Sequence, residues 1–558
     1  MKFKLTQAKF LRVGALGAAL LLGQSCSDSV LDEVVIAGIG NDYLNTPTGF
    51  NDGVNATYSY LRQWYGTETG NNLTTFGTDI YTNGADGGHK FINRYDGQFD
   101  SRSGSINDVW NDLYVGINSA NAVIDRAPNV TGVAENIKKQ RVAEVKFLRA
   151  HYYFILTRTF GGVDLRLTET VEPTKVATRA TVPQMYAAII KDLTEALPDL
   201  ENKARSGDYG RVTRPVAEHM LAEVYLTKAT SEAKAGDDYA KAATYAKNVI
   251  NNYGIELLPN FADVHRPGNE MNKEVIFATQ YTGDPLNNGG GNNSHVFFLM
   301  EYDVLPGMQR DVLNGRPFKR YKPTEYTLDN VFALANRTKD SRYFKTYKDV
   351  YYSNKPGKYN TTFDKSKATV TFALGDTAIY DPGYEMSTAE RAKRPYQVLV
   401  PSAYSERLFP ALSKNLDPNR VDRTQFAGTR DYINYRLADT YLILSEALLN
   451  SGDIPGAVAA INKVRRRAAW PGKEKEMEVA AADMNMMLIM EERARELIGE
   501  QKRWFDLKRW GVLVDRVKKY NPEGAPNIQP YHVLRPIPQN QIDRVEGGKD
   551  AFSQNPGY

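Results

Sequence analysis

Aromatic, amide and carboxylate side chains occur together in two stretches of this chain, residues 78–91 and 295–311. Flat rings can cover the apolar side of a sugar, and planar amides, carboxylates or guanidinium groups can bond its hydroxyls. The two stretches therefore supply both kinds of group that a carbohydrate-binding surface would need. The residues that we expect to contact the ligand are Tyr81, Asn83, Asp86, Phe91, Phe298 and Tyr302. The alternative is that each ring packs on its own loop and that the asparagine forms a turn.

Catalytic patterns are absent from the sequence. The six histidines, at positions 89, 151, 219, 265, 295 and 532, lack the spacing of metal ligands, and no H-E-x-x-H, G-x-S-x-G or G-x-x-x-x-G-K-[ST] motif occurs. This absence agrees with our prediction of a binding protein that is not an enzyme and needs no cofactor or metal. A surface hydrolase remains an alternative, because a chain with 66 acidic residues always offers carboxylate pairs. A calcium ion near Asp79, Asn83 and Asp86 is a further alternative.

The only cysteine, Cys26, follows a segment with the layout of a secretory signal. Basic residues come first, and the uncharged run from Val13 to Gly23 is too short to span a bilayer as a mature helix. Ser25 supplies the small residue that a lipoprotein signal peptidase requires before the cysteine. We predict a signal peptide at residues 1–25, lipidation of Cys26 and a tether over residues 26–48. An ordinary secretory signal is the alternative.

The charge balance agrees with this division. The chain has 70 Lys and Arg against 66 Asp and Glu, and the four excess cations, Lys2, Lys4, Lys9 and Arg12, all lie in the predicted signal. A neutral mature chain has no electrostatic footprint for nucleic acid or anionic lipid. We therefore expect membrane attachment through the lipid alone and no nucleic-acid partner.

Helical patterns dominate two separated regions, about 49–251 and about 436–558. Apolar residues recur at three- and four-residue steps from Trp110 to Ile124, and a second helix is predicted from about Ile137 to Phe160. Three more helices begin with a capping residue two places before a proline. These caps are Thr181, Thr213 and Asp453.

An internal repeat links the two helical regions. Residues 221–226 read L-A-E-V-Y-L and residues 437–442 read L-A-D-T-Y-L, and a second helix follows each copy, at 238–250 and 453–465. Small residues at matching positions of these helices allow close packing, as in stacked tetratricopeptide hairpins. The pattern predicts a mainly α fold of tetratricopeptide-like hairpins; coincidence between amphipathic helices is the alternative.

The segment between the two copies, about 252–435, has a different composition, with frequent Gly, Pro, Asn and Tyr and short strands such as Thr369–Phe372. Residues 67–107 are similarly loop-rich. Loops of this length in a compact domain usually carry function. We predict one domain over residues 49–558, with a helical scaffold that holds these two loop regions.

Several motifs of the chain resemble those of one known family. Residues 110–121 fit W-x-x-L-Y-x-x-I-x-x-A-N, residues 144–154 fit E-x-K-F-L-R-A-x-Y-Y-F, and residues 503–511 read R-W-F-D-L-K-R-W-G. The chain ends with P-I-P at 536–538 and Q-N-P-G-Y at 554–558. Together these motifs resemble the SusD/RagB-like surface lipoproteins of Bacteroidetes nutrient-uptake systems.

The resemblance implies a SusD-like fold in which helical hairpins cradle an irregular segment. It implies a lipid-anchored position at the outer face of the outer membrane and a role as a lid on a SusC-like TonB-dependent transporter. The implied ligand is an oligosaccharide or polysaccharide, and in similar proteins the loop that corresponds to residues 78–91 lies on the ligand face. A peptide ligand, or a mainly assembling role on the same transporter, is the alternative. We expect Arg149, Arg493 and Arg503 to pair with carboxylates or helix ends instead of binding ligand.

Overall fold

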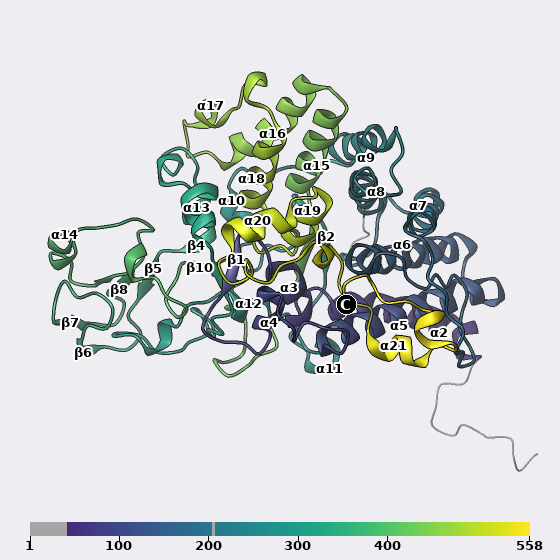
Figure 1. Ribbon diagram of the computed structural model, residues 1–558, viewed down its shortest axis with the longest axis horizontal. Coiled ribbons are helices and arrows are strands. Elements are labelled where there is room, and N and C mark those ends of the chain that lie inside the picture. The colour runs from purple at the N-terminus through teal and green to yellow at the C-terminus, as the bar shows by residue number, and fades with distance from the viewer. Residues whose placement is uncertain (1–41, 204–206) are drawn as a thin grey trace, which may run out of the picture.

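The computed structural model describes residues 42–203 and 207–558, so the predicted signal and Cys26 lie outside the described residues. The described chain is mainly helical, with short strands (Figure 1), which confirms the predicted fold class. The helix α2 begins at Pro47, inside the segment predicted as tether, and Thr46 caps it by accepting from Gly49 N at 3.0 Å. Among the described helices, none has the length and apolar character needed to cross a bilayer.

The helices fall into three groups along the chain. Those of the N-terminal part are α2 (Pro47–Ser59), α3 (Glu68–Thr75), α4 (Lys90–Arg94), α5 (Gly104–Arg126), α6 (Glu135–Phe160), α7 (Val182–Ala196), α8 (Arg214–Lys228) and α9 (Asp238–Asn252). The middle segment has only short helices, α10 (Phe261–Val264), α11 (Pro285–Asn288), α12 (Ser294–Phe297), α13 (Arg342–Thr346) and α14 (Thr388–Ala392). The C-terminal helices are α15 (Leu437–Asn450), α16 (Ile454–Ala468), α17 (Glu474–Met477), α18 (Met486–Glu496), α19 (Arg503–Arg509), α20 (Leu513–Tyr520) and α21 (Gln539–Arg544).

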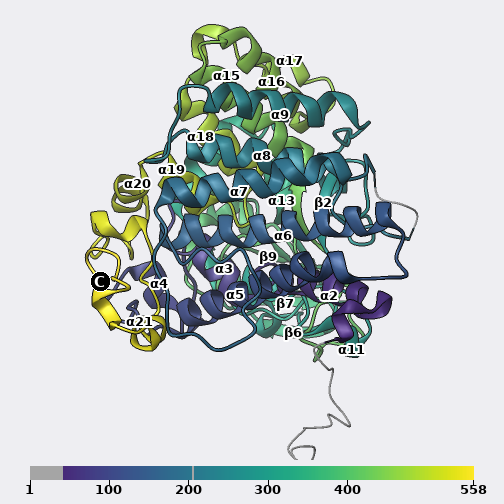
Figure 2. The same cartoon turned by 90° about the vertical axis from the view of Figure 1, so that its right-hand side faces the viewer.

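Helical hairpins form a continuous stack (Figure 2). The order is α2, α5, α6, α7, α8, α9, α15 and α16, and each helix packs against the next. The two sequence repeats are the hairpins α8–α9 and α15–α16, which lie side by side because α9 packs on α15. The small residues at their matching positions, such as Ala242 and Ala457, are fully buried. The predicted repeat is therefore confirmed.

The predicted helix starts are mostly confirmed. Thr181 forms a capping box with Gln184, and the carboxylate of Asp453 accepts from Gly456 N at 2.9 Å. Thr213 precedes α8 as predicted, but its side chain makes no capping hydrogen bond. The first predicted loop region, residues 67–107, is also more regular than expected, since it contains α3 and α4.

Some of the short strands pair with near neighbours in the sequence, and others pair across long separations. The strands are β1 (Tyr81–Asn83), β2 (Val275–Thr279), β3 (Tyr321–Pro323), β4 (Tyr347–Lys348), β5 (Val350–Tyr352), β6 (Gly357–Asn360), β7 (Thr369–Phe372), β8 (Thr377–Tyr380), β9 (Gln397–Val398), β10 (Ala411–Leu412) and β11 (Tyr432–Arg436). The sheets are β1–β3, β2–β11, β4–β10, β5–β8–β9 and β6–β7. The predicted strand Thr369–Phe372 is β7, which pairs with β6 as an antiparallel hairpin.

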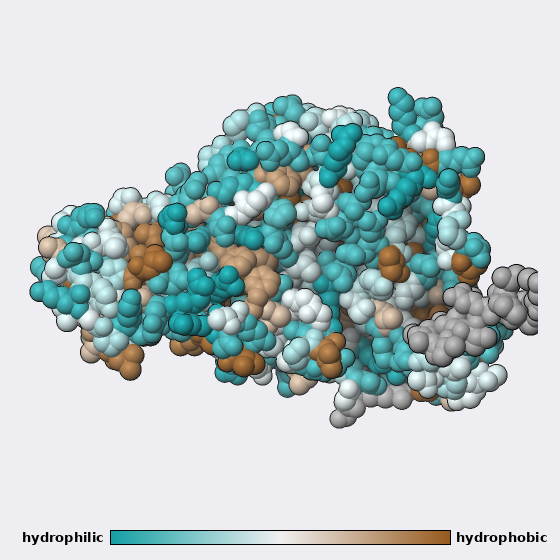
Figure 3. Space-filling view, turned by 90° about the horizontal axis from the view of Figure 1, so that it is seen from below, coloured by the Kyte–Doolittle hydropathy of each residue, from teal (hydrophilic) through white to brown (hydrophobic). Residues whose placement is uncertain are grey.

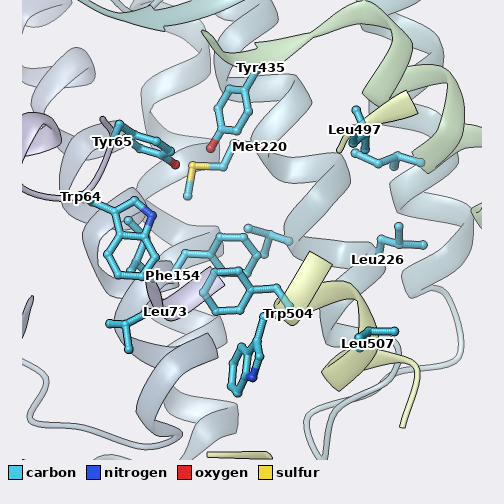
Figure 4. Packing of buried hydrophobic residues seen from close by; sticks show 14 of the residues in the cluster. Trp64, Tyr65, Leu73, Phe154, Met220, Leu226, Tyr435, Leu497, Trp504 and Leu507 are labelled. Atoms are coloured by element: carbon cyan, nitrogen blue, oxygen red, sulfur yellow. The ribbon is translucent and has the colours of Figure 1, made fainter. Parts of the chain in front are cut away.

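The middle segment carries a lobe with its own small core, formed by residues 299–308 and 350–411, and we call these two ranges the lobe (Figure 1, left). The main core instead runs through the helical stack from α5 to α16. Trp64, Phe154, Met220, Tyr435 and Trp504 pack together there (Figure 4). Segments far apart in the sequence thus share one hydrophobic interior.

A buried ionic network joins the middle segment to the C-terminal helices. Arg342 of α13 binds Glu492 at 2.7 Å and Glu496 at 2.9 Å, both on α18. Arg436, at the end of β11, binds Glu496 at 2.7 Å and Glu500 at 2.8 Å. Burial opposes ionisation of Glu496, but the neighbouring guanidinium groups win and lower its pKa to about 2. The expected carboxylate partners of Arg149 and Arg493 are also present, as Asp192 and Asp439.

Removing one member of this network is expected to destabilise the fold strongly. Arg342→Met removes a buried cation that Asp340, Glu492 and Glu496 share, and the loss of charge compensation costs about 3–5 kcal/mol. The matched control is Arg466→Met, because the Arg466–Glu478 pair has side chains 42% and 37% exposed. An exposed pair contributes about 0–1 kcal/mol. Urea midpoints measure both effects, and equal shifts in the two variants would contradict the expectation.

Candidate functional site

The two predicted loop stretches lie side by side. Strand β1 pairs with β3 in an antiparallel register that places Asn83 opposite Tyr321, and the pairing continues as Gly84 N donates to Arg320 O at 2.7 Å. The ring of Tyr81 also meets that of Phe298, with centroids 5.3 Å apart. The surface near β1 is therefore built from both loop regions.

Four of the six predicted contact residues are in the interior, which corrects the solvent-facing placement we expected. The exposed fractions are 1% for Tyr81, 3% for Asn83, 1% for Phe298 and 0% for Tyr302. The face of Tyr302 stacks on Tyr351, and its hydroxyl donates to Gly315 O. A sugar could reach these side chains only if the loops opened, so we do not carry the four into the proposed site. Their role in the structure is to hold the loops together.

The remaining two predicted residues lie at the surface. Asp86 is exposed, and its backbone N–H donates to Lys319 O at 3.2 Å. Phe91 is half-buried, with its ring centroid 5.8 Å from that of His89. Both residues therefore lie in the segment that follows β1.

The Asp79 carboxylate has a structural role. It accepts from Arg503 Nε at 2.8 Å and from Arg516 Nε at 2.5 Å, and its side chain is fully buried. Burial opposes ionisation, but these two arginines hold the pKa of Asp79 below its usual value. Its oxygens are therefore engaged by cations, and the described residues contain no group of three or more His, Cys, Asp or Glu that could hold a metal. This geometry does not support the calcium alternative at Asp79.

Half-buried rings and guanidinium groups surround the segment that contacts Asp86 and Gly87 through Lys319 and Arg320. Phe318 stacks on Phe426 with centroids 5.4 Å apart and planes at 22°. The guanidinium carbons of Arg316 and Arg320 lie 5.3 Å and 5.2 Å from the Phe318 centroid. We call these four residues, together with Asp86, His89 and Phe91, the aromatic–basic surface. Its members are Asp86, His89, Phe91, Arg316, Phe318, Arg320 and Phe426.

Glu68 connects the two sides of this surface. Its carboxylate lies 3.2 Å from His89 Nε2 and forms an ion pair with Arg320. Burial lowers the pKa of His89, so the imidazole is neutral at pH 7 and can donate or accept a hydrogen bond. Arg316 forms no ion pair with the described residues, which leaves its donors available to a ligand. Seen from below, the molecule shows separate apolar patches within a hydrophilic surface (Figure 3).

Sequence reasoning missed Phe318, Phe426 and the arginines around them. The run Arg316-Pro317-Phe318-Lys319-Arg320 alternates basic and aromatic character, which is a local signal. Phe426 has no such signal, because it joins the aromatic–basic surface through its stacking on Phe318, which lies 108 residues earlier in the sequence.

Comparison with known proteins decides the family. Residues 273–558, just over half of the chain, match the family model described as the SusD family. The chain belongs to the SusD family. Residues 45–226 match a second model, described as "Starch-binding associating with outer membrane", and this SusD-family protein is thereby linked to the outer membrane.

Relatives of this SusD-family protein cover most of its length. SusD-like protein P25 of Formosa agariphila is 26% identical over 81% of this chain and 80% of its own. A SusD-like protein of Bacteroides ovatus is 25% identical over 75% of this chain and 68% of its own.

Solved structures share the fold. A laminarin-binding SusD-like protein superposes with a TM-score of 0.68 at 22% identity, over 92% of this chain and 100% of its own. Surface glycan-binding protein A of Bacteroides fluxus superposes with a TM-score of 0.67 at 19% identity, over 92% of this chain and 99% of its own. The helical stack and the loop-rich segment together thus form a SusD-like fold.

The contact between the β1 loop and β3 depends on Gly84. A Cβ atom at this position would lie 2.0 Å from Lys319 O, so Gly84→Ala must displace the loop. Gly88→Ala is the matched control, because nothing lies within 4 Å of a Cβ there. We expect the Gly84 variant to speed amide hydrogen exchange of Asp86 at least about tenfold, since its N–H loses the Lys319 carbonyl. Unchanged exchange, or the same change in both variants, would contradict this role.

Proposed function

We propose that this SusD-family protein is a non-catalytic surface lipoprotein that binds a glycan and delivers it to a SusC-like TonB-dependent transporter. Lipidation of Cys26, with the protein facing the cell exterior, is part of the proposal. The family match supports it, and so do the printed names of two structural neighbours, one laminarin-binding and one surface glycan-binding. Those names describe the neighbours, and the ligand of this chain is proposed from its own surface.

The observation that carries the proposal is the aromatic–basic surface. Sugar rings need an apolar face to stack on and planar polar groups for their hydroxyls. The stacked pair Phe318–Phe426 can offer apolar ring surface, while Arg316 can offer donors and Asp86 can offer acceptors. We assign the glycan contact to these residues together with His89, Phe91 and Arg320.

Isothermal titration of the intact protein against a panel of soluble polysaccharides, laminarin and starch among them, tests the proposal. Heat with at least one glycan and no new reducing ends is the expected result. No heat with any glycan of the panel, together with an outer-membrane barrel that co-purifies, would favour an assembling or peptide-binding role. Released reducing sugar would favour a hydrolase. Either of these outcomes would overturn the glycan-binding proposal.

Substitutions at the aromatic–basic surface locate the contact. Phe318→Ala is expected to weaken glycan binding roughly tenfold, about 1.4 kcal/mol, because it removes one ring of the stacked pair. Arg316→Gln is a second variant that leaves the ring packing unchanged and removes a free guanidinium. The control is Tyr352→Ala, an aromatic residue of the lobe that is 59% exposed. Equal affinity in Arg316→Gln, Phe318→Ala and the control would show that the ligand binds elsewhere.

A further inference from the structure

A concave site elsewhere in the molecule shares no residue with the aromatic–basic surface. It is a cavity of about 600 Å³ between the end of α6, the start of α7, α19 and the C-terminal tail. This volume falls within the range of about 300–1,000 Å³ that is typical of small-molecule sites. Its apolar lining includes Val182, Tyr186, Phe505, Leu534 and Pro556. The cavity is therefore large enough and apolar enough to hold the body of a small ligand.

Two cations that line this cavity have only neutral partners. Lys508 donates to the carbonyl of Arg158, and its Nζ lies 5.7 Å from the Trp504 ring centroid. Arg179 donates to Gly162 O at 2.8 Å, and also to Ser553 O and Asn555 Oδ1 in the tail. Neither Lys508 nor Arg179 forms an ion pair with the described residues.

The other charged groups at the cavity do not neutralise these two cations. Arg158 is paired with Glu223 at 2.7 Å, and Arg509 is paired with Glu446 and with Asp506. Glu232 is the one acidic side chain in the described lining of the cavity, and it is exposed to solvent. The described wall of the cavity thus keeps an excess of positive charge beside apolar surface.

The pKa of Lys508 responds to its burial and to the positive charges around it. Burial lowers its pKa to about 7, and the positive charges of Arg535 and Arg158 act in the same direction. A bound anion would reverse the charge effect and raise the pKa of the ammonium group. Binding at pH 7 to 8 should therefore take up protons from solution, which gives the site a signature that simple packing lacks.

We propose that this cavity binds a small organic anion whose carboxylate or sulfate group is held by Lys508 and Arg179. The body of the anion packs on Phe505 and Leu534. Charge complementarity selects this class of ligand, because an uncharged molecule would leave both cations without a counter-ion. The site is additional to the proposed glycan surface and does not depend on it.

Calorimetry of the intact protein with four probes tests the site. Glucuronate and glucose 6-sulfate carry the two anionic groups on a similar body, glucose is the uncharged control, and inorganic sulfate lacks the body. We expect one or both sugar anions to bind at least tenfold more tightly than glucose and inorganic sulfate. Binding of glucuronate alone would identify the anion as a carboxylate, and binding of glucose 6-sulfate alone would identify it as a sulfate. No binding of either, or equal binding of glucose, would overturn the proposal.

Variants then assign the contact to Lys508. Lys508→Met should lose at least tenfold in affinity, whereas Lys273→Met, at a lysine whose side chain is 73% exposed, should change nothing. Lys508→Arg should keep binding but lose the proton uptake at pH 7.5, measured in two buffers of different ionisation enthalpy, because a guanidinium stays charged. Arg179→Gln, checked for an unchanged melting temperature, should also weaken binding. Wild-type affinity in Lys508→Met, or proton uptake that persists in Lys508→Arg, would exclude Lys508 as the anion contact.

Discussion

The carboxylate of Glu496 is the point on which the arrangement of this protein depends. Guanidinium groups from three separate elements reach it: Arg342 from α13, Arg436 from β11 and Arg467 from α16. Burying charges costs much free energy, so such a cluster adds little net stability compared with an apolar core. It does restrict geometry, because any displacement of one element leaves a buried charge unpaired. The network therefore determines how the loop-rich segment sits on the helical stack.

Buried ion pairs also position the loop before β1. Asp79 is held by Arg503 of α19 and Arg516 of α20, although more than 400 residues separate it from them in the sequence. The backbone carbonyl of Asp79 also accepts from Thr324, next to β3. One residue thereby ties the first loop region both to the C-terminal helices and to the second loop region. This loop region is rich in Gly and Asn, and it takes a defined conformation because its anchor, the Asp79 carboxylate, is buried and ion-paired.

The sequence predicted the scaffold well and the site only in part, for a physical reason. Helical periodicity, the caps at Thr181 and Asp453 and the repeat at 221–226 and 437–442 are local signals, and the structure confirms them. Which face of a loop a ring takes is not local. Tyr81 is buried because β1 pairs with β3 and brings Phe298 against it, a contact across more than 200 residues. Phe318, three residues before β3, stays half-buried.

The lobe also shapes the aromatic–basic surface from its outer edge. Glu301 of the lobe binds both Lys319 and Arg407, at 2.9 Å and 2.6 Å, and Ala85 N donates to Glu406 O at 2.8 Å. The segment after β1 is thus clamped between the main core and the lobe, whose own core is separate. Changes within the lobe core can shift this clamp while the helical stack and its ionic network stay as they are. It follows that the aromatic–basic surface can be reshaped through the lobe without a change to the helical scaffold.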